Sequence, residues 1–141
     1  MRSRKLNEST GRGRERGSAM VEAVLVLMVT LLIIFGAIQW AFVIFGYNSV
    51  AYAARCGSRY AIVHGSSSAT PTNAAGVQAI VLQNLAGIPS TVVTVNTTWS
   101  PDTNPGSTVT VVVTASLAPM IKLVMPNTIS VTSTSKMIIL Q

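Results

Sequence analysis

The residues that could carry chemistry are few. Beyond Arg16, the chain of 141 residues has only two acids, Glu22 and Asp102, together with a single histidine and a single cysteine. General acid–base catalysis, nucleophilic catalysis and a structural zinc site each need several convergent titratable groups. We therefore expect no catalytic residues, no metal site and no cofactor, and a chain that is not an enzyme.

One of the two acids stands in an unusual position. Residues 17–22 read GSAMVE, and after Glu22 no charge follows until Arg55. A carboxylate at the centre of a bilayer costs about 2.5–3.5 kcal/mol on insertion scales, and less near an edge. The positive N-terminal end of a helix dipole would favour Glu22 in a first turn. A residue of this kind needs a partner or a function.

A long helix must position these residues. The run Val21–Phe45 is almost wholly apolar, with Gln39 the main exception, and it exceeds the ~20 residues that cross a bilayer. Helix-forming residues continue beyond it, which predicts one helix from Ser18 to about Val63, roughly 70 Å long. Because the hydrocarbon core takes only about 30 Å, the second half must project and pack on something.

The C-terminal half reads as a short helix followed by strands. Start signals at 71–73 and a stop at Gly87 predict a helix over Asn73–Leu85. Alternating runs rich in Val and Thr predict strands at Thr91–Trp99, Thr108–Leu117 and Ile129–Leu140, with a loop that carries Lys122 between the last two. Three strands with one apolar face need a cover, and the projecting half of the long helix is the natural one. The predicted fold class is α+β.

The basic charge is concentrated at the N-terminus. Six of the ten Lys and Arg residues lie within 1–16, so the formal charge of +6 describes a tail and not a basic domain. The segment 1–17 has no apolar periodicity and is predicted to lack regular structure. It has no aromatic residues and adjoins a membrane segment, which favours a topology signal over a nucleic-acid patch. No nucleic-acid partner is expected.

The junction resembles a known processing site. Residues 17–22 are similar to the cleavage site of type IV prepilins, in which a basic leader ends in Gly and a membrane aspartyl peptidase cuts after it. The resemblance implies a cut between Gly17 and Ser18, with Glu22 as the fifth mature residue. Together with the stretch AARCGSRYA at 53–61, the N-terminal part resembles the TadE-like minor pseudopilins of the tight-adherence (Flp) pilus system.

That resemblance implies an organisation and a location. Residues 1–17 would be the leader, 18–46 the transmembrane half of the helix, 47–64 its projecting half, and 65–141 a pilin-like head outside the cytoplasm. The chain would cross a bacterial inner membrane once, with its N-terminus inside, and later enter a pilus used for attachment. The implied partners are the prepilin peptidase, sister subunits through the N-terminal helix, the assembly platform and the lipid bilayer.

The resemblance also gives Glu22 a role. Cleavage leaves an ammonium on Ser18, about one helical turn from Glu22. When helices bundle in a filament, that ammonium can neutralise the carboxylate of a neighbouring chain in a setting where an unpaired charge is strongly penalised. We hypothesise that this pairing sets the axial register between subunits.

Two alternatives stay open for the whole chain. An uncleaved single-pass membrane protein could assist assembly of a pilus or secretion machine, with Glu22 reaching water at the cytoplasmic interface. A secreted enzyme or binding module could instead be released after Ala53, although the apolar run far exceeds the 7–15 residues of a secretory signal.

Several side chains carry narrower expectations. Arg55 and Arg59 share a helical face, where they contact either acids of a partner subunit or lipid headgroups, or form a solvated stripe. Cys56 is expected to be a small buried residue and His64 a loop residue. Trp40, Phe42, Phe45 and Tyr47 are typical of an aromatic belt at the outer membrane interface, and Trp99 is expected to pack beneath the sheet.

Overall fold

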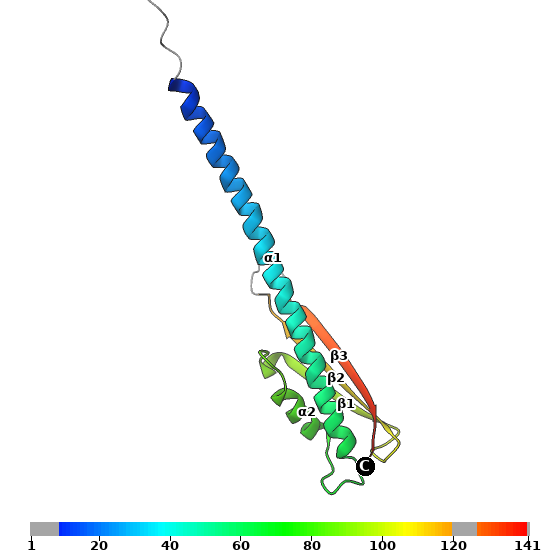
Figure 1. Ribbon diagram of the computed structural model, residues 1–141. Helices are drawn as coiled ribbons and strands as arrows, with labels where there is room; N and C mark the ends of the chain where they lie inside the picture. Colours follow the sequence, from blue (N-terminus) through cyan, green and yellow to red (C-terminus); the bar gives the residue numbers. More distant parts are fainter. Residues whose placement is uncertain (1–8, 120–126, 141) are drawn as a thin grey trace, which may run out of the picture. The chain divides into compact units, whose positions relative to one another are not determined.

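The computed structural model describes residues 9–119 and 127–140, with side chains from Gly17 onward. Leader residues 1–8 and the predicted loop with Lys122 lie outside the described residues. Figure 1 shows the elements in chain order: α1 (Ser9–Val63), α2 (Ala74–Gln83), the 3-10 turn η1 (Ser90–Val92), β1 (Val93–Ser100), β2 (Thr108–Leu117) and β3 (Ile129–Ile138). The predicted α+β class is confirmed. The chain divides into two compact units, Met1–Ile38 and Gln39–Gln141, which are described separately.

The first unit contains the N-terminal part of α1. The stretch Gly17–Val63 is the one span of the described residues that is long and apolar enough to cross a membrane, and its most apolar window has a mean hydropathy of 2.7 with none of it buried. The predicted helix start at Ser18 was wrong, because α1 begins at Ser9 and residues 9–17 are helical. Arg12 and Arg14 are good helix formers, and extending an existing helix needs no new nucleus.

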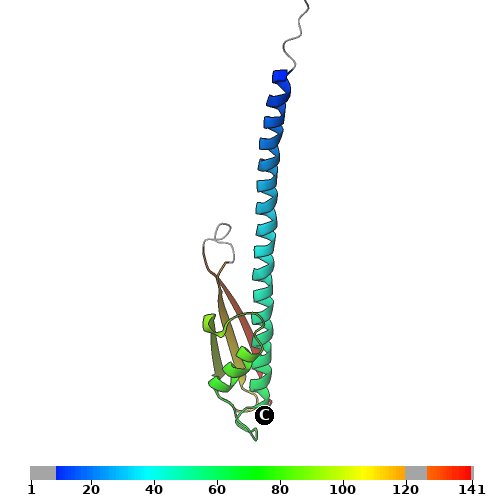
Figure 2. The ribbon, with the colours of Figure 1, turned by 90° about the vertical axis from the view of Figure 1, so that its left-hand side faces the viewer.

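In the second unit, the last turns of α1 pack on the sheet, as Figure 2 shows. The buried side chains of this layer are small: Val50, Ala53, Ala54 and Ala61 on α1 lie in one cluster with Val109, Val111, Val113 and Ala115 on β2. Alanines let a helix approach a sheet closely, and the cluster removes the inward face of β2 from water. The prediction that the projecting half of the helix covers the strands is confirmed.

The short helix α2 forms where the sequence placed it. The side chain of Asn73 accepts a hydrogen bond from the Gly76 amide at 3.0 Å, which caps the N-terminus. The helix ends at Gln83, two residues before the predicted end, and Asn84 closes it by donating from its backbone amide to the carbonyls of Ile80 and Val81. Val77 and Val81 are its buried residues.

The three strands form one antiparallel sheet in the order β1-β2-β3. β1 begins at Val93 and not at Thr91, because Ser90–Val92 turn as a 3-10 helix. β2 has the predicted bounds. β3 ends at Ile138 and not at Leu140, because the next amides bond elsewhere: Ile139 donates to the Ser107 carbonyl at 2.8 Å and Leu140 to the Ile62 carbonyl at 3.1 Å.

Two glycines of α1 mark close approaches to other elements of this unit. A Cβ added at Gly57 would lie 2.5 Å from Cγ2 of Val81 on α2, and one added at Gly46 would lie 2.5 Å from Cδ1 of Leu117 at the end of β2. From the sequence Gly57 looks only like a weak point in a helix. In the structure, the absence of a side chain at Gly57 lets α2 pack closely against α1.

Candidate functional site

The predicted processing and assembly residues share the exposed surface of α1 in the first unit. Gly17, Ser18 and Glu22 are all exposed, and nothing lies within 4 Å of a Cβ added at Gly17. Around Glu22 the helix surface is lined by Ala19, Ala23, Val26, Leu27 and Thr30. None of these side chains is charged, so the carboxylate has no ion-pair partner at helical spacing on its C-terminal side.

Thr30 is the other polar side chain of this surface. Its hydroxyl donates to the carbonyl of Val26 at 2.8 Å, which satisfies it within its own helix. Glu22 is the only titratable side chain from Gly17 to Gly46. From Gly17 onward, the first unit therefore presents one carboxylate on an apolar, exposed helix surface.

The predicted aromatic belt begins in the second unit. Trp40, Phe42, Phe45 and Tyr47 are each about half exposed, between 49% and 58%. Their exposure leaves them free to contact lipid, and their membrane depth stays a prediction. Trp99 packs partly buried against the core, which confirms the expected packing under the sheet.

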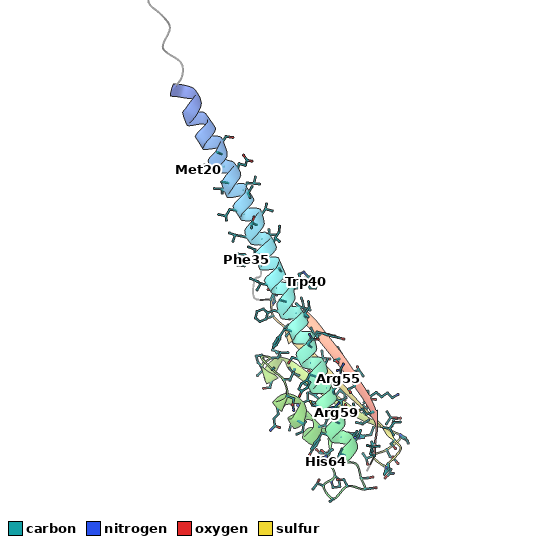
Figure 3. All side chains as sticks on the ribbon, viewed as in Figure 1. Met20, Phe35, Trp40, Arg55, Arg59 and His64 are labelled. Carbon is teal, nitrogen blue, oxygen red and sulfur yellow. The ribbon has the colours of Figure 1, made fainter. Side chains whose placement is uncertain are left out.

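Arg55 and Arg59 are exposed on α1, where Figure 3 labels them. The only acid that follows them in the chain is Asp102, in the turn between β1 and β2. Its carboxylate accepts hydrogen bonds from the Ser107 hydroxyl and from the backbone and side-chain amides of Asn104. These bonds, that of Ser107 foremost, hold the pKa of Asp102 below its ordinary value.

Two neighbours of the arginines have local roles. Cys56, expected to be a small buried residue, is only half-buried; it lies at the margin of the helix face that packs on the core. Its hydrogen bond with Tyr52 raises the pKa of that phenol. His64 follows the last turn of α1, as expected of a loop residue, with Nδ1 2.9 Å from the Tyr60 carbonyl and its ring stacked on that of Tyr60.

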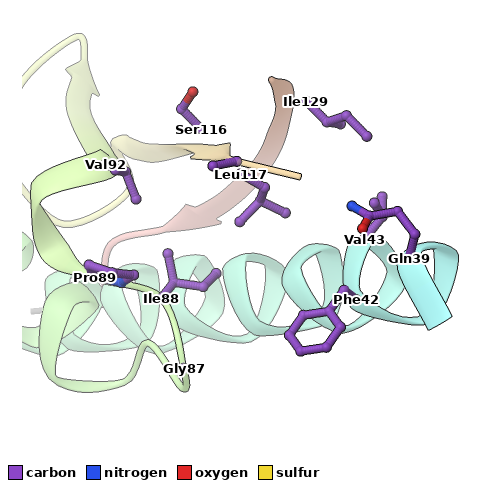
Figure 4. A pocket seen from close by; sticks show the side chains of 11 residues that line it. Gln39, Phe42, Val43, Gly87, Ile88, Pro89, Val92, Ser116, Leu117 and Ile129 are labelled. Atoms are coloured by element: carbon purple, nitrogen blue, oxygen red, sulfur yellow. The ribbon is translucent and has the colours of Figure 1, made fainter. Parts of the chain in front are cut away.

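The second unit also contains an apolar pocket, shown in Figure 4. It has a volume of about 280 Å³ and lies between the start of this part of α1, the loop at 87–92 and the ends of β2 and β3. Gln39 lines it, is only 3% exposed, and has a side-chain oxygen without a hydrogen-bond partner. This pocket was not predicted from the sequence, although Gln39 stands out there as the one main polar residue in an apolar run.

The pocket lining offers no chemistry, because none of its side chains is titratable. Among the residues that the structure describes, no group of three or more His, Cys, Asp or Glu side chains could hold a metal ion. Gly17, Ser18 and Glu22 belong to the first unit, and Arg55 and Arg59 to the second. The predicted site residues thus lie on exposed surface: one acid on an apolar helix in the first unit, and a pair of arginines in the second.

Comparison with known proteins bears on the same two features. The family model described as TadE-like protein matches residues 17–59, a segment that begins at Gly17, includes Glu22 and ends at Arg59. No curated protein and no solved structure matches the chain. The match and the single apolar helix support a membrane protein associated with a tight-adherence pilus. Over residues 17–59, this chain is similar to the TadE-like protein family.

Proposed function

We propose that this chain is a minor pilin or pseudopilin of a tight-adherence pilus. In this role it is cut after Gly17, held in the inner membrane by α1, and then assembled into or at the start of a filament used for attachment. The observation that carries the proposal is the TadE-like segment, in which an exposed apolar helix carries one acid five residues after a glycine. The role is structural, and the chain performs no catalysis.

The basic leader supplies the orientation. Lys and Arg residues beside a membrane span stay on the cytoplasmic side, so the arginine-rich segment before Gly17 keeps the N-terminus inside and directs the rest of the chain outward. The prepilin peptidase then acts at the cytoplasmic surface, at the bond between Gly17 and Ser18. Removal of the leader takes away the charges that would oppose withdrawal of the helix from the bilayer.

Cleavage also creates the group that Glu22 lacks. The new ammonium of Ser18 lies about one helical turn from Glu22, and in a bundle of helices the ammonium of one chain can reach the carboxylate of the next. Leaving one of two buried charges unpaired costs about 3–5 kcal/mol, so the pairing favours one axial register over its neighbours. The exposed, uncharged surroundings of Glu22 suit such a contact.

The apolar surface of α1 then serves in two environments. Before assembly it faces lipid, and the exposed run from Val21 to Phe45 is long enough to span the hydrocarbon core. After assembly the same side chains face other helices, so they remain out of water in both states.

The N-terminus of the membrane form tests the proposal. Intact mass and N-terminal sequencing of the chain purified from membranes should give a start at Ser18. A start at Met1 would exclude processing and favour the uncleaved anchor, and a start at Ala54 would favour a secreted module. A Gly17→Ala variant should accumulate the uncut form, while Gly36→Ala on the same helix should be cut normally.

One observation favours the uncleaved alternative. The α-helix is continuous from Ser9 through the bond between Gly17 and Ser18, so the Gly17 carbonyl is placed to accept from the amide one turn later. A peptidase must open this turn before it can attack the bond. In the alternative the helix simply continues, the chain stays a single-pass membrane protein, and it assists pilus or secretion-system assembly without joining the filament.

A further inference from the structure

The apolar pocket of the second unit contains one buried polar atom without a partner. Gln39 and Ser116 are the only polar side chains of its lining, and the others are aliphatic, aromatic or glycine. Gln39 is only 3% exposed, and its Oε1 has no hydrogen-bond partner within the described part of the chain. Because a buried acceptor without a donor is unfavourable, the pocket suits an apolar group that carries one N–H or O–H.

An indole ring matches this pocket in size and in chemistry. A cavity of about 150 Å³ lined by aliphatic and aromatic side chains holds benzene, and this pocket has a volume of about 280 Å³. The indole of tryptophan is a larger apolar ring system with a single N–H donor and no acceptor. A buried indole N–H usually finds a hydrogen-bond partner, and the Gln39 oxygen can accept it.

The chain presents such a ring on its own surface. Of its two tryptophans, Trp99 is partly buried against the core, whereas Trp40 is 58% exposed on α1 (Figure 3). Trp40 does not line the pocket of its own chain. With about 100° between successive residues of a helix, it points to a different side of α1 from Gln39.

A second copy of the chain brings Trp40 to the depth of the pocket. The stretch Gly17–Val63 is the one candidate span of the described residues, so copies inserted in the same orientation hold equal residues at equal depths. Trp40 follows Gln39 directly, and one residue adds only about 1.5 Å along a helix. Trp40 of one copy therefore lies level with the pocket of a parallel neighbour, without an axial shift.

Two-fold symmetry makes this contact reciprocal. Gln39, Phe42 and Val43 form the α1 wall of the pocket, and Trp40 flanks that wall on one side. In a parallel pair related by a two-fold axis along the membrane normal, a residue on one side of the contact line meets the residues on the other side in the partner. Each Trp40 then faces the pocket of the other chain, and both pockets are filled.

Lipid and water are poorer occupants of the pocket. The hydrocarbon part of an acyl chain has no donor, so it would fill the space and leave the Gln39 oxygen without a hydrogen bond. A buried water molecule typically makes about three hydrogen bonds, and the lining offers only Gln39 and Ser116 as polar side chains. An indole both fills the apolar space and supplies the missing donor.

We propose that two copies of this chain form a parallel dimer in the membrane. Trp40 of each copy inserts into the pocket of the other and donates its indole N–H to the Gln39 oxygen. This inference rests on the membrane span and on the second unit, and it goes beyond the proposed function. It does not depend on cleavage after Gly17 or on incorporation into a filament.

Photocrosslinking tests where position 40 lies. The full chain with p-benzoylphenylalanine in place of Trp40 is irradiated in phosphatidylcholine vesicles, and the crosslinked peptides are identified by mass spectrometry. The proposal predicts dimers that are joined from position 40 to the pocket segments 87–92 or 116–118 of a second copy. Monomer alone, with or without lipid adducts, would overturn the dimer. Crosslinks to other parts of a second copy would overturn the assignment of the pocket.

The strength of the contact is measured in the same vesicles. Förster transfer between copies labelled at the C-terminus gives the dissociation constant of the dimer. Trp40→Ala should raise this constant at least about tenfold, as expected for an aromatic anchor that fills a pocket. Tyr52→Ala removes an aromatic side chain of similar exposure, 59%, from the same helix and should leave the constant unchanged. An equal loss in the two variants would overturn the contact.

A double-mutant cycle tests the hydrogen bond. Trp40→Phe keeps an aromatic ring and removes the donor, while Gln39→Leu removes the acceptor. Each change should raise the dissociation constant about three- to tenfold, and the two together should raise it no more than either alone, because both remove the same bond. Losses that multiply in the double variant would overturn the bond between Trp40 and Gln39.

Discussion

The hydroxyl groups of Ser58 on α1 and Ser135 on β3 lie 2.7 Å apart inside the second unit, where both side chains are buried. Ser58 also lies within hydrogen-bond distance of the Arg55 carbonyl, at 3.1 Å. Each hydroxyl satisfies the other in a place that water does not reach. The pair joins the helix to the third strand.

Ser58→Ala should therefore lower the free energy of unfolding of the second unit by about 1–3 kcal/mol, because it leaves the Ser135 hydroxyl buried without that partner. Denaturant titration of the full chain in micelles measures the loss. Replacing both serines by alanine should cost less than the sum of the two single changes. Strictly additive losses would contradict a direct bond between the hydroxyls.

Gly57→Ala should destabilise the second unit by about 1–3 kcal/mol, because the new Cβ would meet Val81 at 2.5 Å. Thermal unfolding followed by circular dichroism measures the shift. Gly36→Ala is the matched control, since nothing lies within 4 Å of a Cβ at that position. Adding Val81→Ala to Gly57→Ala should restore part of the loss, and no restoration would mean that the contact is not the cause.

Asp102 should make the second unit acid-sensitive. Its pKa is lowered in the fold, chiefly by the Ser107 hydroxyl, so its stabilising effect is present above the ordinary value of 3.8 and is lost as the pH falls through the lower folded value. The unfolding midpoint measured from pH 6 down to strongly acidic pH should fall less in Asp102→Asn than in the unchanged chain. Identical pH profiles would show that the carboxylate contributes nothing to the turn.

Glu22→Gln should separate processing from assembly. The variant keeps the shape of the side chain and removes the charge that the Ser18 ammonium would neutralise, so the chain should be cut normally but recovered in sheared filaments at about a tenth of the usual amount or less. Quantitative immunoblotting of membrane and filament fractions measures both. Thr30→Ala, which removes a hydroxyl bonded within its own helix, should assemble normally. Normal incorporation of Glu22→Gln would remove the proposed role of the acid.

Local patterns predicted most of the fold. The alternation of Thr108–Leu117 gave β2 with its observed bounds, and Asn73 capped α2 as its side chain suggested. The start of β1 was misplaced because Thr91 and Val92, both strand formers, lie in a 3-10 turn. The end of β3 was misplaced because Ile139 and Leu140 bond to Ser107 and Ile62, partners that only the folded chain brings near.

The candidate site, like the fold, could be predicted from the sequence only in part. Gly17, Ser18 and Glu22 could be singled out because their chemistry contrasts with their immediate neighbours in the sequence. The pocket lined by Gln39 could not, because its other walls come from the segment 87–92 and the ends of β2 and β3, which are remote in sequence. From its local sequence, Gly57 likewise reads only as a residue that weakens a helix. Its structural role is a close contact with Val81, which no local pattern predicts.

The most direct test of the account is the intact mass of this chain in sheared, purified filaments. The account predicts a mass that begins at Ser18, with the leader absent from every incorporated copy. Filaments that contain the chain with its N-terminus still at Met1 would contradict it, since Glu22 would then lie in a packed helix bundle without the ammonium that is proposed to neutralise it.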